Sequence, residues 1–393
     1  MPRFPFPLVP IAFLTAIFYL NFVSRIILGP FLPVIVNELG LGHGAAGSLF
    51  VFVQIGYASG LLGSGFVSWR LTHRRTITLS SVAMGVAMLV LSQARTLGEI
   101  HACLVLVGTG AGLYLPTGIA TITELVDERH WGKALALHEL APNLGFITAP
   151  LLAEALFAVL SWRGVLGVVG SGAILLGGCF ARWGQGGTRR GEALRLATVR
   201  QVVREPSLWV MAWLFGMGVG ASLGVYTMIP LFLVSEIGFS RETANTVTGF
   251  SRVVSLAMIL VAGWIADRLG DRRALALALT LTGAIVLGLG AFTGPLITPV
   301  LILFQSASAV LFFPPAFAAV SRLFPGTRRH LAISLSTTVG STVGAGVVPS
   351  AIGHLADAVS FSAALVLIGI VAMASPLLLV VGGRGAGRTR ARA

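Results

Sequence analysis

The chain has 393 residues, of which 55% are hydrophobic and only 10% are charged, and its formal net charge is +13. This composition, with a mean hydropathy of +0.91, lies outside the range of soluble globular domains and excludes a soluble enzyme or binding module. Long apolar stretches recur along the whole chain, and a helix of about 20 such residues crosses a bilayer. The sequence therefore predicts an all-α integral membrane protein.

Twelve membrane spans are predicted, six in each half of the chain. Their approximate bounds are 8–36, 44–69, 76–94, 98–123, 132–160 and 163–183, then 207–234, 242–266, 273–293, 296–322, 331–355 and 359–381. Residues 1–183 and 207–381 are thus predicted to form two six-helix bundles. The polar stretch 184–206 is predicted to be a cytoplasmic linker with a short surface helix near residues 195–204, and the Gly/Arg-rich residues 382–393 a disordered basic cytoplasmic tail.

The two halves repeat each other at a nearly constant offset of 198 residues. Glu38 and Gly40 correspond to Glu236 and Gly238, and Pro116 corresponds to Pro314. One residue is then gained, so that Gly145, Pro150 and Arg129 correspond to Gly344, Pro349 and Arg328. Repetition on this scale in an apolar chain predicts two pseudo-symmetric membrane bundles with a path between them, an architecture that moves solutes.

The positive charge is distributed unevenly between the two sides of the predicted membrane. With both termini in the cytoplasm, 22 of the 27 Lys and Arg residues lie on the cytoplasmic side. This asymmetry follows the positive-inside rule, and anionic inner-leaflet lipids account for the excess charge. We therefore expect a multi-pass protein of the inner (plasma) membrane with both termini cytoplasmic, contacts with membrane lipids, and no nucleic-acid partner.

A spaced loop motif follows the eighth predicted span. Its pattern is G-x-x-x-D-R-x-G-x-R-R, formed by Gly263, Asp267, Arg268, Gly270, Arg272 and Arg273. Gly263 allows a close helix approach, Asp267 can accept from arginines or a helix N-terminus, and Gly270 permits a tight turn. The equivalent first-half loop keeps Gly65, Arg70, Arg74 and Arg75 but has Trp69 and Thr72 in place of the aspartate and the turn glycine.

This motif, together with the repeat and the span number, resembles the signature loop of the major facilitator superfamily over essentially the whole chain. The resemblance implies a twelve-helix fold and secondary active transport by alternating access. It also implies that these loops act as a gating latch on the cytoplasmic side. Since Trp69 replaces the acidic residue, we expect the two loops to contribute unequally to gating.

Polar residues inside the spans are the candidates for substrate binding, because a charge in the membrane is retained only with a partner or a water-filled cavity. Arg25 and Arg252 are the two arginines within spans, and the repeat places Gln54 opposite Arg252. Alternative roles are snorkelling for Arg25 and a buried structural ion pair for Arg252. The other predicted substrate-binding residues are Asn21, Tyr226, Asn143, Gln305 and Thr338.

Two neighbouring residues of the fifth span are predicted to couple transport to protons. Imidazole exchanges protons near neutral pH, and a desolvated carboxyl group can do so, which points to His138 and Glu139. Glu139 and Asn143 share a helix face, with His138 about 100° away. A static ion pair between Glu139 and an arginine is the alternative.

These features predict a transporter of a small organic anion, of the carboxylate type, with proton symport. Arginine recognises carboxylates through paired hydrogen bonds, which favours an anion. The alternative is proton-coupled efflux of amphipathic drugs, in a cavity lined by Phe146, Phe250, Phe304, Phe312 and Phe313. We expect no catalytic group, metal or cofactor, so the chain is predicted not to be an enzyme, and we expect a monomer.

Overall fold

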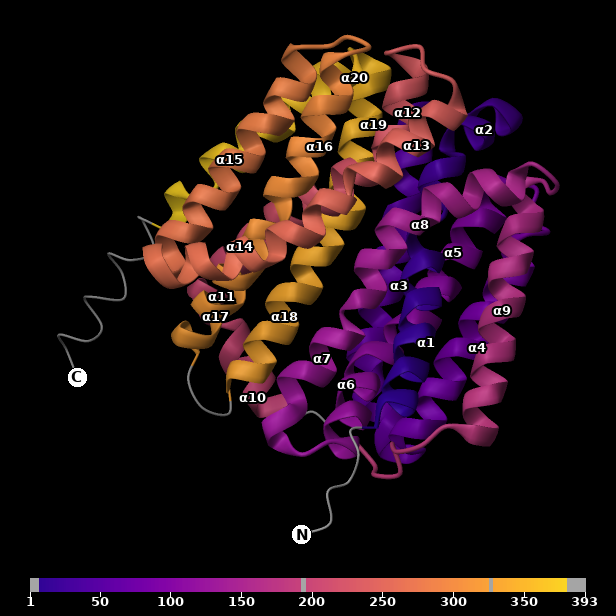
Figure 1. The fold of residues 1–393 in the computed structure, drawn as a ribbon, viewed down its shortest axis with the longest axis vertical. Coiled ribbons are helices and arrows are strands. Elements are labelled where there is room, and N and C mark those ends of the chain that lie inside the picture. Colours follow the sequence, from indigo (N-terminus) through magenta and orange to yellow (C-terminus); the bar gives the residue numbers. More distant parts are fainter. Residues whose placement is uncertain (1–6, 192–195, 325–327, 380–393) are drawn as a thin grey trace. The chain divides into compact units, whose positions relative to one another are not determined.

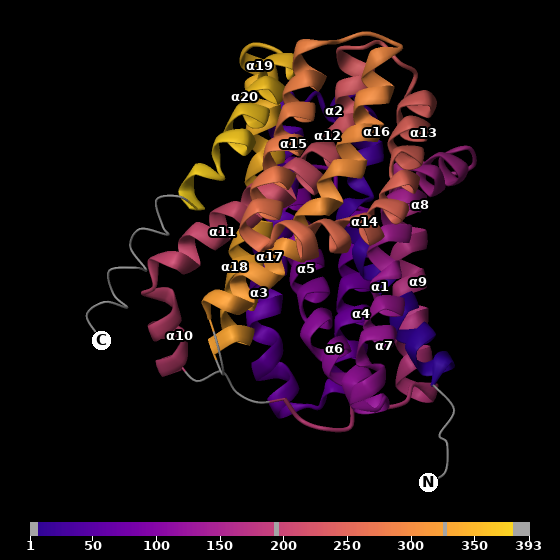
Figure 2. The same cartoon turned by 60° about the vertical axis from the view of Figure 1, so that its left-hand side comes forward.

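The structure is a computed structural model that describes residues 7–191, 196–324 and 328–379 (Figures 1 and 2). Every element in these residues is a helix. Eleven helical segments are long and apolar enough to cross a membrane, and twelve if the bent segment formed by α13 (Arg241–Ser251) and α14 (Val253–Leu269) counts as one span. The predicted all-α fold is confirmed.

The chain divides into two compact units. Unit 1 comprises residues 1–34 and 52–194, and unit 2 comprises residues 35–51 and 195–393. The segment Ile35–Val51, which connects the first two spans, thus groups with the second unit. The predicted bundle boundaries, with a linker at 184–206, stay a prediction.

Unit 1 contains the third to sixth spans complete and most of the first two. Its helices are α1 (Leu8–Ile26), α2 (Leu28–Leu39, shared with unit 2), α3 (His43–Arg70, shared), α4 (His73–Leu91), α5 (Leu97–Gly112), α6 (Tyr114–Leu125), η1 (Glu128–His130), α7 (Trp131–His138), α8 (Leu140–Phe157) and α9 (Trp162–Trp183). Helix α4 packs on α9 and α5, and α1 packs on α8. After α9 the chain passes the start of α4, where the carbonyl oxygens of Gly187 and Arg189 accept from the amides of Arg74 and His73, respectively.

Unit 2 repeats this arrangement of long, broken helices. Besides α13 and α14 it contains α10 (Leu196–Val203), α11 (Pro206–Val219), the π-helix η2 (Gly220–Gly224), α12 (Val225–Ser235), α15 (Asp271–Ala291), α16 (Ile297–Ala309), η3 (Val310–Phe312), α17 (Phe313–Leu323), α18 (Arg328–Thr342), the π-helix η4 (Val343–Val347), α19 (Val348–Ala358) and α20 (Phe361–Ala374). Helix α15 packs on α20 and α16, and α11 packs on α18. The short helix expected near residues 195–204 is present as α10.

Hydroxyl side chains mark where several of these helices begin. In each case the side chain accepts a hydrogen bond from the backbone amide three residues later, which satisfies one of the free amides of the first turn. These capping residues are Thr72, Thr96, Ser161, Ser240 and Ser360. Ser161 and Ser360 are equivalent positions of the repeat, so the start of the last span is specified in the same way in both halves.

Equivalent glycines make equivalent helix contacts in the two units. In unit 1 a Cβ atom on Gly85 of α4 would lie 2.5 Å from the carbonyl oxygen of Gly170 on α9. In unit 2 a Cβ atom on Gly283 of α15 would lie 2.8 Å from the carbonyl oxygen of Gly369 on α20. Both pairs allow backbone-to-backbone packing, which drives helix association in a membrane. The sequence repeat is therefore also a repeat of packing, and Figure 1 shows α4 beside α9 and α15 beside α20.

Candidate functional site

Arg25 lies in the last turn of α1, where the first span is broken. Pro30 has no amide hydrogen to donate to the carbonyl of Ile26, which explains the interruption between α1 and α2. The side chain is buried, with 9% of the residue exposed. Its guanidinium carbon lies 4.1 Å from the ring centroid of Tyr57 and 5.2 Å from that of Phe22. Among the described residues no acceptor takes a hydrogen bond from its buried Nε, and no carboxylate forms an ion pair with it.

Gln54 and Tyr57 lie one turn apart on α3, and side chains at this spacing share a helix face. Gln54 is 4% exposed, and its Oε1 has no hydrogen-bond partner in the part of the chain that the structure describes. Asn21, also predicted in this group, instead donates from Nδ2 to the carbonyl oxygen of Ala111 at 2.9 Å and ties α1 to α5. Unit 1 thus brings a buried guanidinium close to the helix face that carries a buried amide oxygen.

Arg252 stands between α13 and α14 and is 3% exposed. Its Nη2 donates to the carbonyl oxygen of Ser222 at 2.7 Å, and its Nη1 donates to the Ser222 hydroxyl at 3.3 Å. The guanidinium carbon lies 4.7 Å from the ring centroid of Tyr226. Gln305, on α16 and fully buried, donates from Nε2 to the carbonyl oxygen of Ala221. Arg252, Tyr226 and Gln305, all predicted as substrate-binding, therefore gather around the π-helix η2.

His138 and Glu139 lie where α7 ends and α8 begins. Pro142 cannot donate to the carbonyl of His138, so the helix breaks here. His138 is fully buried and stacks on Phe18, with the ring centroids 4.4 Å apart. The Glu139 side chain is 59% exposed, and its Oε1 lies 3.9 Å from Nδ1 of His138. The predicted partner Asn143 donates from Nδ2 to the Glu139 backbone carbonyl, not to its carboxylate.

Tyr114, which was not predicted as a site residue, contacts His138. Its hydroxyl donates to the carbonyl oxygen of Leu14 at 2.7 Å and lies 3.0 Å from Nε2 of His138. With the hydroxyl hydrogen directed to Leu14, the tautomer that completes the contact with Tyr114 carries its hydrogen on Nε2 and has Nδ1 as an acceptor on the side of Glu139.

The hydroxyl residues of α18 mostly bond to their own helix. Thr337, Ser341 and Thr342 donate to carbonyls three or four residues earlier, as hydroxyl residues in helices commonly do. Thr338, predicted as substrate-binding, is 6% exposed, and its hydroxyl has no partner among the residues described.

The gating motif forms the turn between α14 and α15. Gly270 has φ +75°, the left-handed conformation that the motif predicted for a turn glycine. A Cβ atom at Gly263 would meet nothing within 4 Å, so no close helix approach occurs there within the described residues. Arg268 lies over the Trp264 ring, and the neighbouring Asp271 pairs with Nε of Arg322 at 2.8 Å, a contact absent from the predictions.

The first-half loop uses its cations differently. Arg70 lies over the rings of Phe66 and Trp69, at 4.9 and 5.8 Å, so the residue that replaces the aspartate is an aromatic partner of the following arginine. Arg74 donates from Nη2 to the carbonyl oxygen of Ala181 at 3.1 Å.

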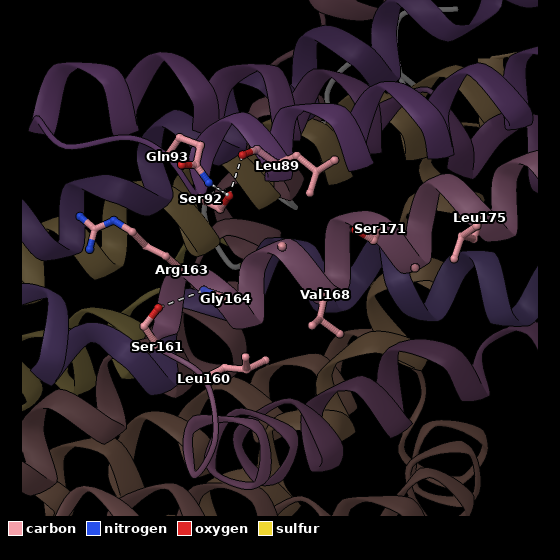
Figure 3. A pocket seen from close by; sticks show the side chains of 12 residues that line it. Leu89, Ser92, Gln93, Leu160, Ser161, Arg163, Gly164, Val168, Ser171 and Leu175 are labelled. Atoms are coloured by element: carbon pink, nitrogen blue, oxygen red, sulfur yellow. Dashed lines mark hydrogen bonds between the residues drawn. The ribbon is translucent and has the colours of Figure 1, made fainter.

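A shallow groove between α4 and α9 holds none of the predicted site residues (Figure 3). Ser92, Gln93 and Arg163 line one end of it. Val168 and Leu175, which line the rest, are 47% and 69% exposed, as expected for side chains that face lipid. This groove lies on the outside of unit 1 and is not a candidate substrate site.

The fold and these polar clusters define a multi-pass membrane transporter. The family model described as Major Facilitator Superfamily matches residues 13–295 and 224–392, and the chain belongs to this family. The predicted family assignment is therefore confirmed.

Relatives and solved structures of similar fold are transporters with different named substrates. A gallate transporter from Pseudomonas putida is 22% identical over 305 residues, which cover 68% of this chain and 67% of the relative. A galactose-proton symporter from Escherichia coli strain K12 is 25% identical over 145 residues, which cover 37% of this chain and about a third, 31%, of the relative. A bacterial homolog of the human lysosomal transporter Spinster has a similar fold, with a TM-score of 0.81 over 98% of both chains at 15% identity.

Proposed function

We propose that this transporter carries a small organic anion of the carboxylate type together with protons, and that Arg25 binds the anion. The observation that carries the proposal is the buried guanidinium of Arg25, which has ring faces around it and no carboxylate partner among the described residues. The proposal includes an inner-membrane location with both termini cytoplasmic.

A buried charge without a counter-ion is strongly unfavourable, and removal of one partner from a buried ion pair typically costs about 3–5 kcal/mol. The rings of Tyr57 and Phe22 attract the cation but accept no strong hydrogen bond. A carboxylate supplies both the missing charge and two acceptors in the geometry that a guanidinium prefers. Gln54, one turn from Tyr57, adds an amide group that can bind a polar substituent of the same substrate.

The proton pathway is assigned to Glu139 with His138. Nδ1 of His138 is an acceptor that faces the Glu139 carboxylate at 3.9 Å, so a proton taken up by Glu139 can be shared with the imidazole. The exposed side of the carboxyl group gives it access to solvent protons, whereas Tyr114 fixes the opposite side of the ring. We prefer this pair to the alternative of a static ion pair between Glu139 and an arginine, because the Glu139 carboxylate lies beside His138.

The substrate named for one relative and the coupling ion named for another support this choice. Gallate is an aromatic carboxylate, and the other relative is named as a proton symporter. Both are distant relatives, so they support the class of substrate and the type of coupling and no specific compound.

The test is transport by the purified protein in proteoliposomes, with radiolabelled gallate and benzoate as probes. We expect an inward proton gradient to drive accumulation and a protonophore to abolish it. Arg25→Gln should raise the KM by about tenfold to a hundredfold, the value of a hydrogen bond to a charged group. Arg25→Lys should lose less because it keeps the charge, and Arg95→Gln, at an exposed position, is the control with the same loss of charge.

Transport of ethidium without transport of either carboxylate, and without sensitivity to Arg25→Gln, would instead support drug efflux. That outcome would overturn the proposed substrate class and leave the family assignment unchanged.

A further inference from the structure

The π-helix η2 interrupts the seventh span in the middle of unit 2. A π-helix bonds each amide to the carbonyl five residues earlier, so the transition from an α-helix leaves carbonyls without their usual amide. Here the amide of Val225 is shared between the carbonyls of Gly220 and Ser222. Four of the five residues are buried and Leu223 is partly buried. Carbonyls of this segment that lose their backbone partners therefore need other donors.

Two side chains from other helices supply these donors to adjacent carbonyls. Gln305 of α16 donates to the carbonyl oxygen of Ala221. Arg252, at the junction of α13 and α14, donates to both the carbonyl oxygen and the hydroxyl oxygen of Ser222. Both donors are buried, at 0% and 3% exposed. Hydrogen bonds from a cationic donor in such surroundings are among the strong ones.

The segment η2 also packs on the second π-helix, η4. A Cβ atom on Gly344 would lie 2.5 Å from the amide nitrogen of Gly220 and 2.5 Å from the carbonyl oxygen of Gly216. The segment therefore contacts both a closely packed backbone and two side-chain donors.

The first half of the chain provides an internal comparison. The repeat places Gln54 at the position of Arg252 and Val107 at the position of Gln305, so one donor is shortened and the other is absent. The equivalent first span has no π-helix in its described part; it breaks into two α-helices at Ile27. The pair of donors and the π-helix thus occur together in one half and are absent together in the other.

We propose that Arg252 and Gln305 are positioning residues that maintain the π-helical shape of Gly220–Gly224. They act on transport through this segment and the Tyr226 ring that follows it, not through contact with the transported anion. Of the two arginines within the spans, only Arg25 then binds the anion. The kinetic part of this inference rests on the proposed function, whereas the structural part does not.

The structural arm measures hydrogen–deuterium exchange in peptides that cover residues 216–231. Arg252→Gln and Gln305→Leu should each raise exchange in this segment by about tenfold or more, because each removes a donor that protects it. Arg25→Gln, the matched substitution in the other unit, should leave exchange there unchanged.

The kinetic arm compares the same variants in gallate counterflow, or in ethidium counterflow if the wild type carries only ethidium. Arg252→Gln and Gln305→Leu should lower the maximal rate about tenfold with the KM within about twofold of wild type, whereas Arg25→Gln should mainly raise the KM for gallate. Arg252→Lys keeps the charge but has one nitrogen in place of the two that bond to Ser222, and it should give an intermediate rate.

The inference is overturned if exchange in 216–231 is unchanged in either variant, or if Arg252→Gln raises the KM as Arg25→Gln does. If Arg252→Gln does not reach the membrane, Gln305→Leu and Arg252→Lys decide by the same criteria. Failure of the wild type to carry either carboxylate would reject the substrate class and leave the exchange result interpretable.

Discussion

The guanidinium carbon of Arg25 lies 4.1 Å from the ring centroid of Tyr57, and this contact joins the end of α1 to the face of α3 that carries Gln54. The ring holds the cation in place without neutralising it. Under the proposed function, this leaves the guanidinium available to the transported anion.

Tyr57→Leu should weaken anion binding by about threefold to thirtyfold, because a desolvated cation–π contact contributes about 0.5–2 kcal/mol. Tyr57→Phe keeps the ring and should stay near wild type. The measurement is the concentration dependence of gallate counterflow for both variants. Equal losses in the two variants would assign the effect to the hydroxyl group and contradict this role of the ring.

Glu139→Gln should abolish proton-driven accumulation of substrate and preserve substrate counterflow. The amide cannot take up a proton, so proton-driven uptake should be lost, while counterflow of substrate across the membrane should continue at a rate similar to wild type. The measurement is gallate uptake with and without a pH gradient. Asn143→Ala removes a side chain that bonds to the Glu139 backbone carbonyl and not to its carboxylate, so it should keep the response to the pH gradient. Gradient-driven accumulation by Glu139→Gln would reject this residue as the coupling site.

Gly85→Leu should destabilise unit 1 severely, because the added side chain would meet the backbone of α9 at the Gly170 carbonyl. Gly283→Leu should have the same effect in unit 2. Thermal unfolding in detergent, followed by the fluorescence of a thiol or tryptophan probe, measures the change. Gly178→Leu, on α9 with open space around the position, should unfold near the wild-type temperature.

Asp357→Ala should remove the cap of α3. The Asp357 carboxylate accepts from the amides of His43 and Gly44, both at 2.8 Å, and its Oδ1 lies 3.0 Å from Nδ1 of His43. Loss of a helix cap costs about 0.5–2 kcal/mol, so the midpoint of thermal unfolding should fall. Asp127→Ala is the matched control, because the Asp127–Arg129 pair is exposed and contributes little. An equal fall in both variants would contradict the capping role.

The sequence predicted the parts of this fold that depend on composition and period. Hydropathy located the spans, and the offset of the repeat anticipated the equivalent packing of Gly85 with Gly170 and of Gly283 with Gly369. The turn conformation of Gly270 followed from its place in the motif.

The interruptions within the spans were not predicted, although most carry a signal. Pro30 and Pro142 each follow a break by three residues, as expected when a proline cannot donate to the carbonyl four residues earlier. The break at Arg252 and the position of η2 have no such mark, because they depend on donors from distant helices. Gly220–Gly224 and Arg252 are joined only in the folded unit.

The sequence predicted the ionisable residues of the proposed site and missed the residues beside them. Arg25, His138 and Glu139 were identified because charge and imidazole are rare in membrane spans. Tyr57 could have been found from its spacing to Gln54. Ser222 and Tyr114 could not, since their roles depend on which carbonyl or ring nitrogen the fold places beside their oxygen atoms.

The cap on α3 also has a consequence for biosynthesis. Asp357 is separated from His43 by 314 positions, so the second span leaves the ribosome long before its capping carboxylate exists. Until the eleventh span has been inserted, two amides at the start of α3 must rely on water or lipid headgroups. The start of α3 is therefore among the last parts of the newly made chain to reach its final hydrogen bonding.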